Sequence, residues 1–327
     1  MQDDTLNQVL ERSPWADWRR APVAGDASAR RYLRLTAPEG SETVIAMDAG
    51  RDSAGEITRF VAMAKHLRSI GLQAPEVLLH DSGRGIVVME DLGPNQLAAW
   101  LRQHPEDETE AYLAAVDMVV RVQSAPPPPG LTRMDPATAA GMTDVLAEWY
   151  LTDPAPGPAI AAALRDALEA RTDPALVLSL RDFHAENLVW RAERGDLARL
   201  GVLDFQDAVL ADASYDLVSL LRDARRDVSP ATAAAATARF VAERGLDPDM
   251  FGARMAVVAV QRNLRILGIF ARLIRRDGKP RYAAFVPRVW RMLGEDLGHP
   301  DLGLLRRRIA PLLPSPEESG LAEALRT

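Results

Sequence analysis

The sequence predicts an α+β protein of two lobes, and three observations support this fold class. In residues 1–92, short apolar runs and turn residues surround one helical pattern, which indicates a small antiparallel sheet with one main helix. Residues 93–327 contain successive amphipathic patterns of helical period. Residues 176–205 interrupt these helices with strands and loops that carry closely spaced Asp and Asn residues.

The small lobe is predicted to fold as β-β-α-β-β, preceded by a short helix over residues 5–12. Turn residues at 38–41 and 81–85 join the two strands of each pair. Gly71 follows the helical pattern and is a suitable residue to end it. The expected strands are residues 30–35, 43–47, 77–79 and 86–89, and the expected helix is residues 53–70.

The large lobe is predicted to be mostly helical outside the strand-and-loop segment. Gly93 and Pro94 fit a hinge followed by the start of a helix. We therefore expect two domains, a nucleotide-binding lobe of residues 1–92 and a catalytic and substrate lobe of residues 93–327. The expected helices are residues 95–103, 106–124, 137–150, 158–171, 214–226, 230–244, 248–276 and 281–296.

Composition narrows the class of protein. A net charge of −7 disfavours nucleic acid as a main partner. The absence of cysteine excludes disulfides, thiolate metal sites and a thiol nucleophile. No apolar run approaches the ~20 residues of a membrane span, and no signal peptide is recognisable. We expect a cytoplasmic monomer that acts on a small molecule, without a nucleic-acid or membrane partner.

The most informative polar pattern lies in residues 180–190 and continues to residue 205. Asp182 is followed five residues later by Asn187, and Asp204 follows a second apolar run. In phosphoryl transfer, one Asp accepts the proton of the attacking hydroxyl, while an Asn and a second Asp hold Mg²⁺ against the nucleotide phosphates. Protein kinases have a His two residues before the first Asp, and here that position is Leu180. The pattern therefore predicts a small-molecule kinase with a bilobal, protein-kinase-like fold.

A second group of residues is predicted to bind nucleotide. Gly25 and Ser28 precede a strand in a loop suited to phosphate contacts. The third strand has no lysine to grip the phosphates, so either an arginine replaces it or the protein is a degraded kinase. Only one of Arg30 and Arg31 can face the nucleotide, because they are neighbours on a strand; we favour Arg31. Glu56 at the start of the helix is a candidate to orient this cation.

The sequence also predicts an adenine contact, a supporting role for one further Asp, and a set of substrate residues. Backbone groups around Glu90 and Leu92, at the end of a strand, are expected to contact the adenine edge. Asp216 is expected to cap or support a loop. The candidate substrate residues are His184, Gln261, Arg262 and Arg265, because amides and guanidinium groups suit a hydroxyl-rich or carboxylate-bearing substrate.

The residues around Asp182, Asn187 and Asp204 resemble the aminoglycoside phosphotransferase and choline kinase superfamily. Residues 25–32, 215–222 and 261–273 are similar to one branch of it, the anomeric kinases of bacterial cell-wall recycling that act on N-acetylmuramate and N-acetylglucosamine. The resemblance implies ATP, Mg²⁺ and a sugar with a free C1 hydroxyl. It carries over Asp182 as the base and Asn187 and Asp204 as metal ligands. It also implies that the missing lysine is a property of the branch.

Two alternatives remain open from the sequence. A kinase for another small alcohol, such as an aminoglycoside or choline, would need a cleft lined with carboxylates or aromatic rings, whereas the late helices are rich in arginine. A catalytically silent nucleotide-binding regulator would fit the missing lysine but not the intact Asp182, Asn187 and Asp204.

Overall fold

The computed structural model describes residues 2–23 and 30–321 of the chain. It divides into two compact units, and neither is continuous in sequence. The first comprises Met1–Pro105 and Ala185–Asp207, and the second comprises Glu106–His184 and Ala208–Thr327. This division differs from the predicted boundary after residue 92, because part of the strand-and-loop segment joins the first unit.

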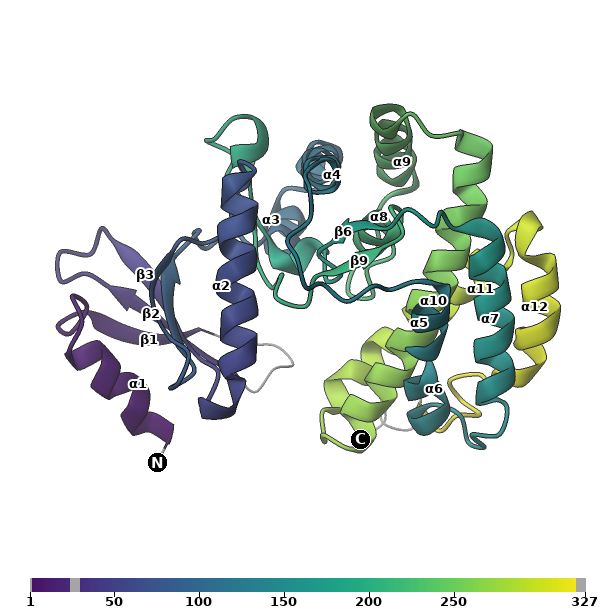
Figure 1. The fold of residues 1–327 in the computed structure, drawn as a ribbon, viewed down its shortest axis with the longest axis horizontal. Coiled ribbons are helices and arrows are strands. Elements are labelled where there is room, and N and C mark those ends of the chain that lie inside the picture. The colour runs from purple at the N-terminus through teal and green to yellow at the C-terminus, as the bar shows by residue number, and fades with distance from the viewer. Residues whose placement is uncertain (1, 24–29, 322–327) are drawn as a thin grey trace. The chain divides into compact units, whose positions relative to one another are not determined.

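A five-stranded antiparallel sheet forms the centre of the first unit (Figure 1). Its strand order is β1-β2-β3-β5-β4. The strands are β1 (Arg19–Val23), β2 (Arg31–Thr36), β3 (Thr43–Asp48), β4 (Val77–Asp81) and β5 (Ile86–Glu90). Four of them were predicted, and the antiparallel pairing is confirmed. The sequence analysis missed β1, an edge strand whose arginines and Pro22 obscure the apolar alternation typical of strands.

Two helices cover the sheet from opposite sides (Figure 1). Helix α1 (Gln2–Glu11) packs its apolar residues against one face, in a cluster with Leu35, Val44 and Val88. Helix α2 (Ala54–Ser69) lies on the other side and buries Phe60 and four further apolar residues along one stripe. Because neighbouring strand residues point to opposite faces, each side of β2 and β3 faces a different helix.

The first unit is completed by helix α3 (Leu97–Gln103) and a short hairpin of β7 (Leu188–Trp190) and β8 (Leu200–Val202). Single backbone bridges tie this hairpin to the first unit, from Gln73 to Gly201 and from Gln96 to Val189. These bridges explain why the hairpin belongs with the N-terminal strands rather than with the helices that flank it in sequence.

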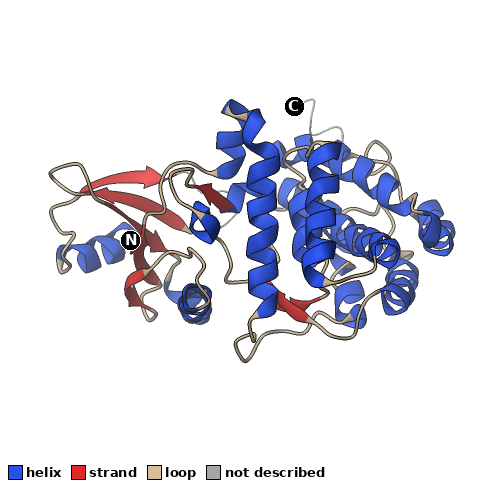
Figure 2. Ribbon diagram, turned by 90° about the horizontal axis from the view of Figure 1, so that it is seen from above, coloured by secondary structure: helices blue, strands red, loops and turns tan. Residues whose placement is uncertain are grey.

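The second unit is built mainly from helices (Figure 2). They are α4 (Glu108–Ser124), α5 (Pro136–Gly141), α6 (Asp144–Trp149), α7 (Gly157–Arg171), α8 (Tyr215–Leu221), α9 (Pro230–Arg244), α10 (Pro248–Arg275), α11 (Val286–Leu297) and α12 (Gly303–Ile309). The predicted helix at 137–150 is two helices, α5 and α6. A two-stranded pair of β6 (Val177–Ser179) and β9 (Val209–Ala211) lies among the helices.

Helix α10 is the central element of the second unit. Its start follows from Asp247, whose carboxylate accepts from the amides of Asp249 and Met250, and from Pro248 at the first helical position. At Gly268 the helix approaches α6 so closely that an added Cβ would lie 2.5 Å from the backbone nitrogen of Leu146. Over the described residues, no helix combines the length and apolar character needed to cross a membrane.

Candidate active site

The β7–β8 hairpin brings Asn187 and Asp204 to the same end of one structural element. Asn187 immediately precedes β7, and Asp204 lies two residues after β8. Leu188 pairs with Val202, and the amide of Leu203 donates to the carbonyl of Asn187 at 2.8 Å. Two residues that are 17 positions apart in sequence are therefore neighbours because the strands between them are antiparallel.

Asp204 adopts a backbone conformation that few residues other than glycine tolerate. Its φ is 57°, in the left-handed region, where Asp is enriched among the non-glycine residues. The next residue, Phe205, is fully buried and stacks on Phe60 of α2, with ring centroids 5.1 Å apart. The side-chain amide of Gln206 donates through Nε2 to Asp204 Oδ1 at 2.7 Å. These contacts fix the backbone on the C-terminal side of Asp204.

Arg30 lies beside Asp204, whereas the sequence analysis favoured Arg31 as the phosphate contact; that choice stays a prediction. Arg30 Nη2 donates to Glu56 Oε2 at 3.0 Å, and its Nη1 lies 3.5 Å from Asp204 Oδ1. Burial opposes the charge of Arg30, yet the hydrogen bond to Glu56 and the nearby Tyr32 and Asp204 raise its pKa above the ordinary value. Arg31 alternates to the other face of β2, with Leu33 and Leu35.

Asn187 and Asp204 together suit Mg²⁺. The ion prefers oxygen ligands and is usually held by one or two carboxylates together with substrate phosphates and water. No group of three or more His, Cys, Asp or Glu side chains able to hold a metal occurs among the described residues. A carboxylate and an amide oxygen at one hairpin end therefore fit a metal that arrives with a nucleotide.

Asp182 belongs to the second unit. The loop that carries it is held by hydrogen bonds to the side chain of Asp216. Asp216 is fully buried in α8 and accepts three hydrogen bonds, from Ser179 Oγ at 2.6 Å, Leu180 N at 2.8 Å and Arg181 N at 2.9 Å. Arg181 has a φ of 70°. Burial raises the pKa of Asp216 to about 6, although these hydrogen bonds favour its ionised form. The supporting role predicted for Asp216 agrees with these contacts.

Two of the predicted substrate residues make hydrogen bonds within the second unit. Arg262, which is 6% exposed, donates to Ser219 Oγ at 2.8 Å, and Ser219 in turn donates to the carbonyl of Arg181. Gln261, which is 1% exposed, donates to the carbonyl of Ala139 at 2.8 Å. Because α10 is buried over much of its surface, its polar residues face neighbouring helices as readily as a ligand.

His184 and Arg265 remain candidates for substrate contact. His184 is buried, and its Nε2 lies 3.4 Å from Arg225 Nη1. Burial and the charges of Arg225 and Arg262 lower the pKa of His184 well below its ordinary value, so the ring is neutral near pH 7. Burial and the charge of Arg181 lower the pKa of Arg265, while the nearby Asp182 raises it. Arg265 thus places a positive charge near the predicted base.

The predicted nucleotide contacts can be placed only in part. Gly25 and Ser28 lie outside the described residues. The amide of Glu90 already donates to the carbonyl of Glu76 at 2.8 Å, and its carboxylate accepts from Arg68. The backbone N–H of Glu90 is therefore already used within the first unit. Leu92 packs its side chain against Gly201, where an added Cβ would lie 2.7 Å from Leu92 Cδ1.

Comparison with known proteins identifies the family of the chain. Residues 19–251 match the model of the phosphotransferase enzyme family. The chain belongs to this family. The phosphotransferase is 39% identical to an N-acetylmuramate/N-acetylglucosamine kinase of Caulobacter vibrioides, over 91% of this chain and 93% of that protein. It is 33% identical to the protein of the same name from Neisseria meningitidis serogroup B, with 84% of each chain covered.

Solved structures show the same fold at low sequence identity. A choline/ethanolamine kinase family protein from Mesorhizobium loti has a TM-score of 0.65 at 16% identity, covering 94% of this phosphotransferase and 99% of that chain. The ADP-bound aminoglycoside phosphotransferase APH(2'')-Ib has a TM-score of 0.61 at 16% identity, covering 90% and 99%. The kinase-like fold and the family resemblance predicted from the sequence are confirmed.

Proposed function

We propose that this phosphotransferase transfers the γ-phosphoryl group of ATP, in the presence of Mg²⁺, to the anomeric C1 hydroxyl of an amino sugar such as N-acetylmuramate or N-acetylglucosamine. The observation that carries the proposal is the pairing of Asn187 with Asp204 at one hairpin end, in a chain whose relatives over most of its length are named for these two sugars.

Each polar residue has a defined part in this reaction. Asp182 would orient the sugar hydroxyl and accept its proton. Asn187 and Asp204 would hold Mg²⁺ against the phosphates of ATP, which supplies the phosphoryl group when bound. Asp216 would keep the Asp182 loop in place through its three hydrogen bonds. Catalysis then rests on positioning and on neutralising phosphate charge.

The choice of the C1 hydroxyl is consistent with a single carboxylate as the base. An anomeric hydroxyl is more acidic than an ordinary alcohol, so a carboxylate is a sufficient proton acceptor. The positive charge of Arg265 near Asp182 favours a neutral or anionic acceptor over a cationic one such as choline or an aminoglycoside.

The test is ADP release in a coupled assay with Mg-ATP and a set of acceptors. N-acetylmuramate and N-acetylglucosamine should be turned over, and the methyl glycoside of N-acetylglucosamine, which is blocked at C1, should not. Turnover of the blocked glycoside would refute the C1 assignment. Turnover of choline or kanamycin alone would refute the sugar assignment, and silence with every acceptor would favour a nucleotide-binding regulator.

A further inference from the structure

Met47, near the end of the third strand, faces α2 and carries no charge. Protein kinases place on this strand a lysine that contacts the nucleotide phosphates and pairs with a glutamate of the following helix. In β3, Met47 is 2% exposed and lies directly opposite Tyr32 of β2. Directly opposed residues of antiparallel strands share a face, so Tyr32 and Met47 point to the same side of the sheet.

Arg30 lies on this same side. It is two residues before Tyr32, and alternate residues of an extended chain share a face. Tyr32 lies close enough for its hydroxyl to interact with the guanidinium group. Arg30 is also the residue that reaches Glu56, in the first turn of α2. Its partner is therefore a glutamate of the helix that follows β3, as for the lysine of protein kinases.

We propose that Arg30 supplies from the start of the second strand the phosphate-binding charge that protein kinases supply from the third. This inference rests on the proposed use of a nucleotide but not on the identity of the acceptor. Arginine suits the displaced position because its fork of five donors can contact Glu56 and a phosphate at the same time. The side chain is 15% exposed, so its charge is already held within the first unit.

The position of Arg30 also couples nucleotide binding to metal binding. Arg30 Nη1 lies 3.5 Å from Asp204 Oδ1, and Asp204 is the carboxylate proposed to hold Mg²⁺. Without nucleotide, the guanidinium charge opposes a divalent cation at Asp204. With nucleotide, the phosphates provide Arg30 with a new anionic partner. Removing this charge should therefore change the two affinities in opposite directions, which general damage to the fold would not do.

The test uses Arg30→Gln and measures two binding constants without any acceptor. The affinity for a fluorescent ADP analogue should fall on the order of tenfold or more, as expected for loss of a hydrogen bond between charged groups. The affinity of the nucleotide-free protein for Mn²⁺, followed by electron paramagnetic resonance, should rise by roughly threefold or more. Arg59→Gln is the control, because Arg59 is an exposed arginine one turn along α2 from Glu56.

The outcomes separate the possibilities. Weaker nucleotide binding with tighter Mn²⁺ binding supports the proposal. An unchanged ADP affinity, or a loss of both affinities, overturns it. The same pair of measurements on Arg31→Gln decides between the two arginines, and a larger loss of ADP affinity there would overturn the assignment to Arg30. If binding follows the expected pattern but no sugar is phosphorylated, the proposed acceptor fails while this inference stands.

A second variant tests the position as well as the charge. Arg30→Gln combined with Met47→Lys moves the positive charge to the third strand, beside the vacated guanidinium site. If the double variant recovers at least half of the ADP binding free energy lost in Arg30→Gln, a charge on the third strand can replace the charge of Arg30, and the proposal is supported. A double variant with native circular dichroism that binds ADP no better than Arg30→Gln would overturn it.

Discussion

Asp182 and Asp204 are held in different ways, although both are proposed to act on the same reaction. The Asp182 loop is fixed through its backbone, by the fully buried Asp216 and by a chain of contacts from Arg262 through Ser219. The side chain of Asp204 is 45% exposed, and its partners include the side chains of Arg30 and Gln206. A buried backbone network suits a base that must be positioned before the substrate arrives. Side-chain ion pairs suit ligands that must exchange partners when metal and nucleotide bind.

The largest expected effect comes from removing the base itself. Asp182→Asn keeps the size of the side chain but cannot accept the proton of the acceptor hydroxyl, so kcat should fall about 10²- to 10⁴-fold. Nucleotide affinity should stay within twofold, because Asp182 is not among the residues assigned to metal or phosphate. Steady-state kinetics and titration with a fluorescent ADP analogue measure the two quantities. Normal turnover would disprove the assignment of the base.

The second prediction concerns the support beneath Asp182. In Asp216→Asn one carboxylate oxygen becomes an NH₂ group, so either Leu180 N or the donors Ser179 and Arg181 face another donor instead of an acceptor. A buried donor left without a partner costs about 1–3 kcal/mol. We expect a fall in kcat of tenfold or more and a lower Tm. A variant with normal kcat would show that the buried network is not needed to position Asp182.

The raised pKa of Asp216 gives this prediction a pH dependence. The native pKa is about 6 and the ordinary value is 3.8, so between about pH 4 and 6 the native protein holds a proton that the unfolded chain has released. This group's contribution to stability therefore falls as pH rises through that range. The ionised form, which accepts all three hydrogen bonds, predominates only above about pH 6. We expect kcat of the wild type to fall below pH 6, and this acidic limb to move to lower pH in Asp216→Asn.

Helices α9 and α10 were predicted from the sequence to within one residue, whereas the predicted helices at 214–226 and 281–296 extend beyond α8, which ends at Leu221, and α11, which begins at Val286. Helix α10 was expected at 248–276 and spans Pro248–Arg275, because its period persists over seven turns. The strands β1 and β9 were missed, since one is an arginine-rich edge and the other is only three residues long. Helices α5 and α6 were joined in the prediction, because the turn between them contains no proline.

The candidate site residues also fall into two groups, those indicated by their spacing in the sequence and those that depend on strand register or helix packing. The sequence could single out Asp182, Asn187 and Asp204 because their spacing reflects the loop and hairpin that carry them; their catalytic and metal-binding roles stay predictions. The choice of Arg30 over Arg31 depends on strand register, which a single sequence does not specify before β2 and β3 are paired. The substrate roles predicted for Gln261 and Arg262 stay predictions: both side chains contact neighbouring elements, because α10 packs against neighbours on most sides and periodicity does not distinguish its contact faces.

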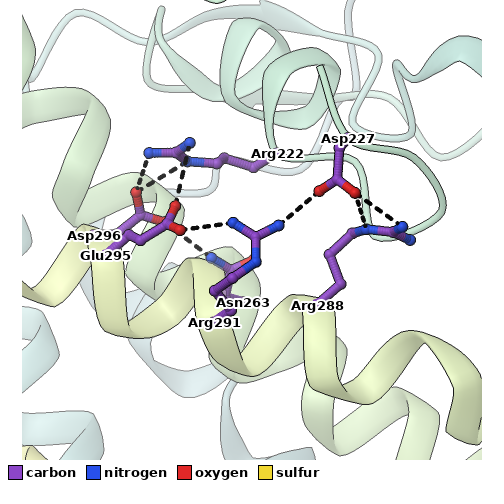
Figure 3. Close-up of polar contacts among 7 residues, drawn as sticks. All are labelled: Arg222, Asp227, Asn263, Arg288, Arg291, Glu295 and Asp296. Atoms are coloured by element: carbon purple, nitrogen blue, oxygen red, sulfur yellow. Dashed lines mark hydrogen bonds and ion pairs between the residues drawn. The ribbon is translucent and has the colours of Figure 1, made fainter. Parts of the chain in front are cut away.

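The contrast between buried and exposed carboxylates can be tested away from the proposed site, where catalysis does not complicate the result (Figure 3). Asp296 has a 3% exposed side chain and accepts from Arg222 at 2.7 Å and from Asn263 at 3.0 Å. Asp227 has a 61% exposed side chain and pairs with Arg288 at 3.1 Å and with Arg291 at 2.6 Å. The two carboxylates have similar partners but differ in access to water.

We expect Asp296→Asn to lower the free energy of unfolding by about 2–3 kcal/mol, because a buried, charge-assisted hydrogen bond is lost. Asp227→Asn should cost less than about 1 kcal/mol, and added salt should remove this cost, since water and ions already screen the exposed pair. Urea denaturation at low and high salt measures both. Equal losses would mean that burial does not set the contribution of a carboxylate here. The distinction drawn between Asp216 and Asp204 would then lose its physical basis.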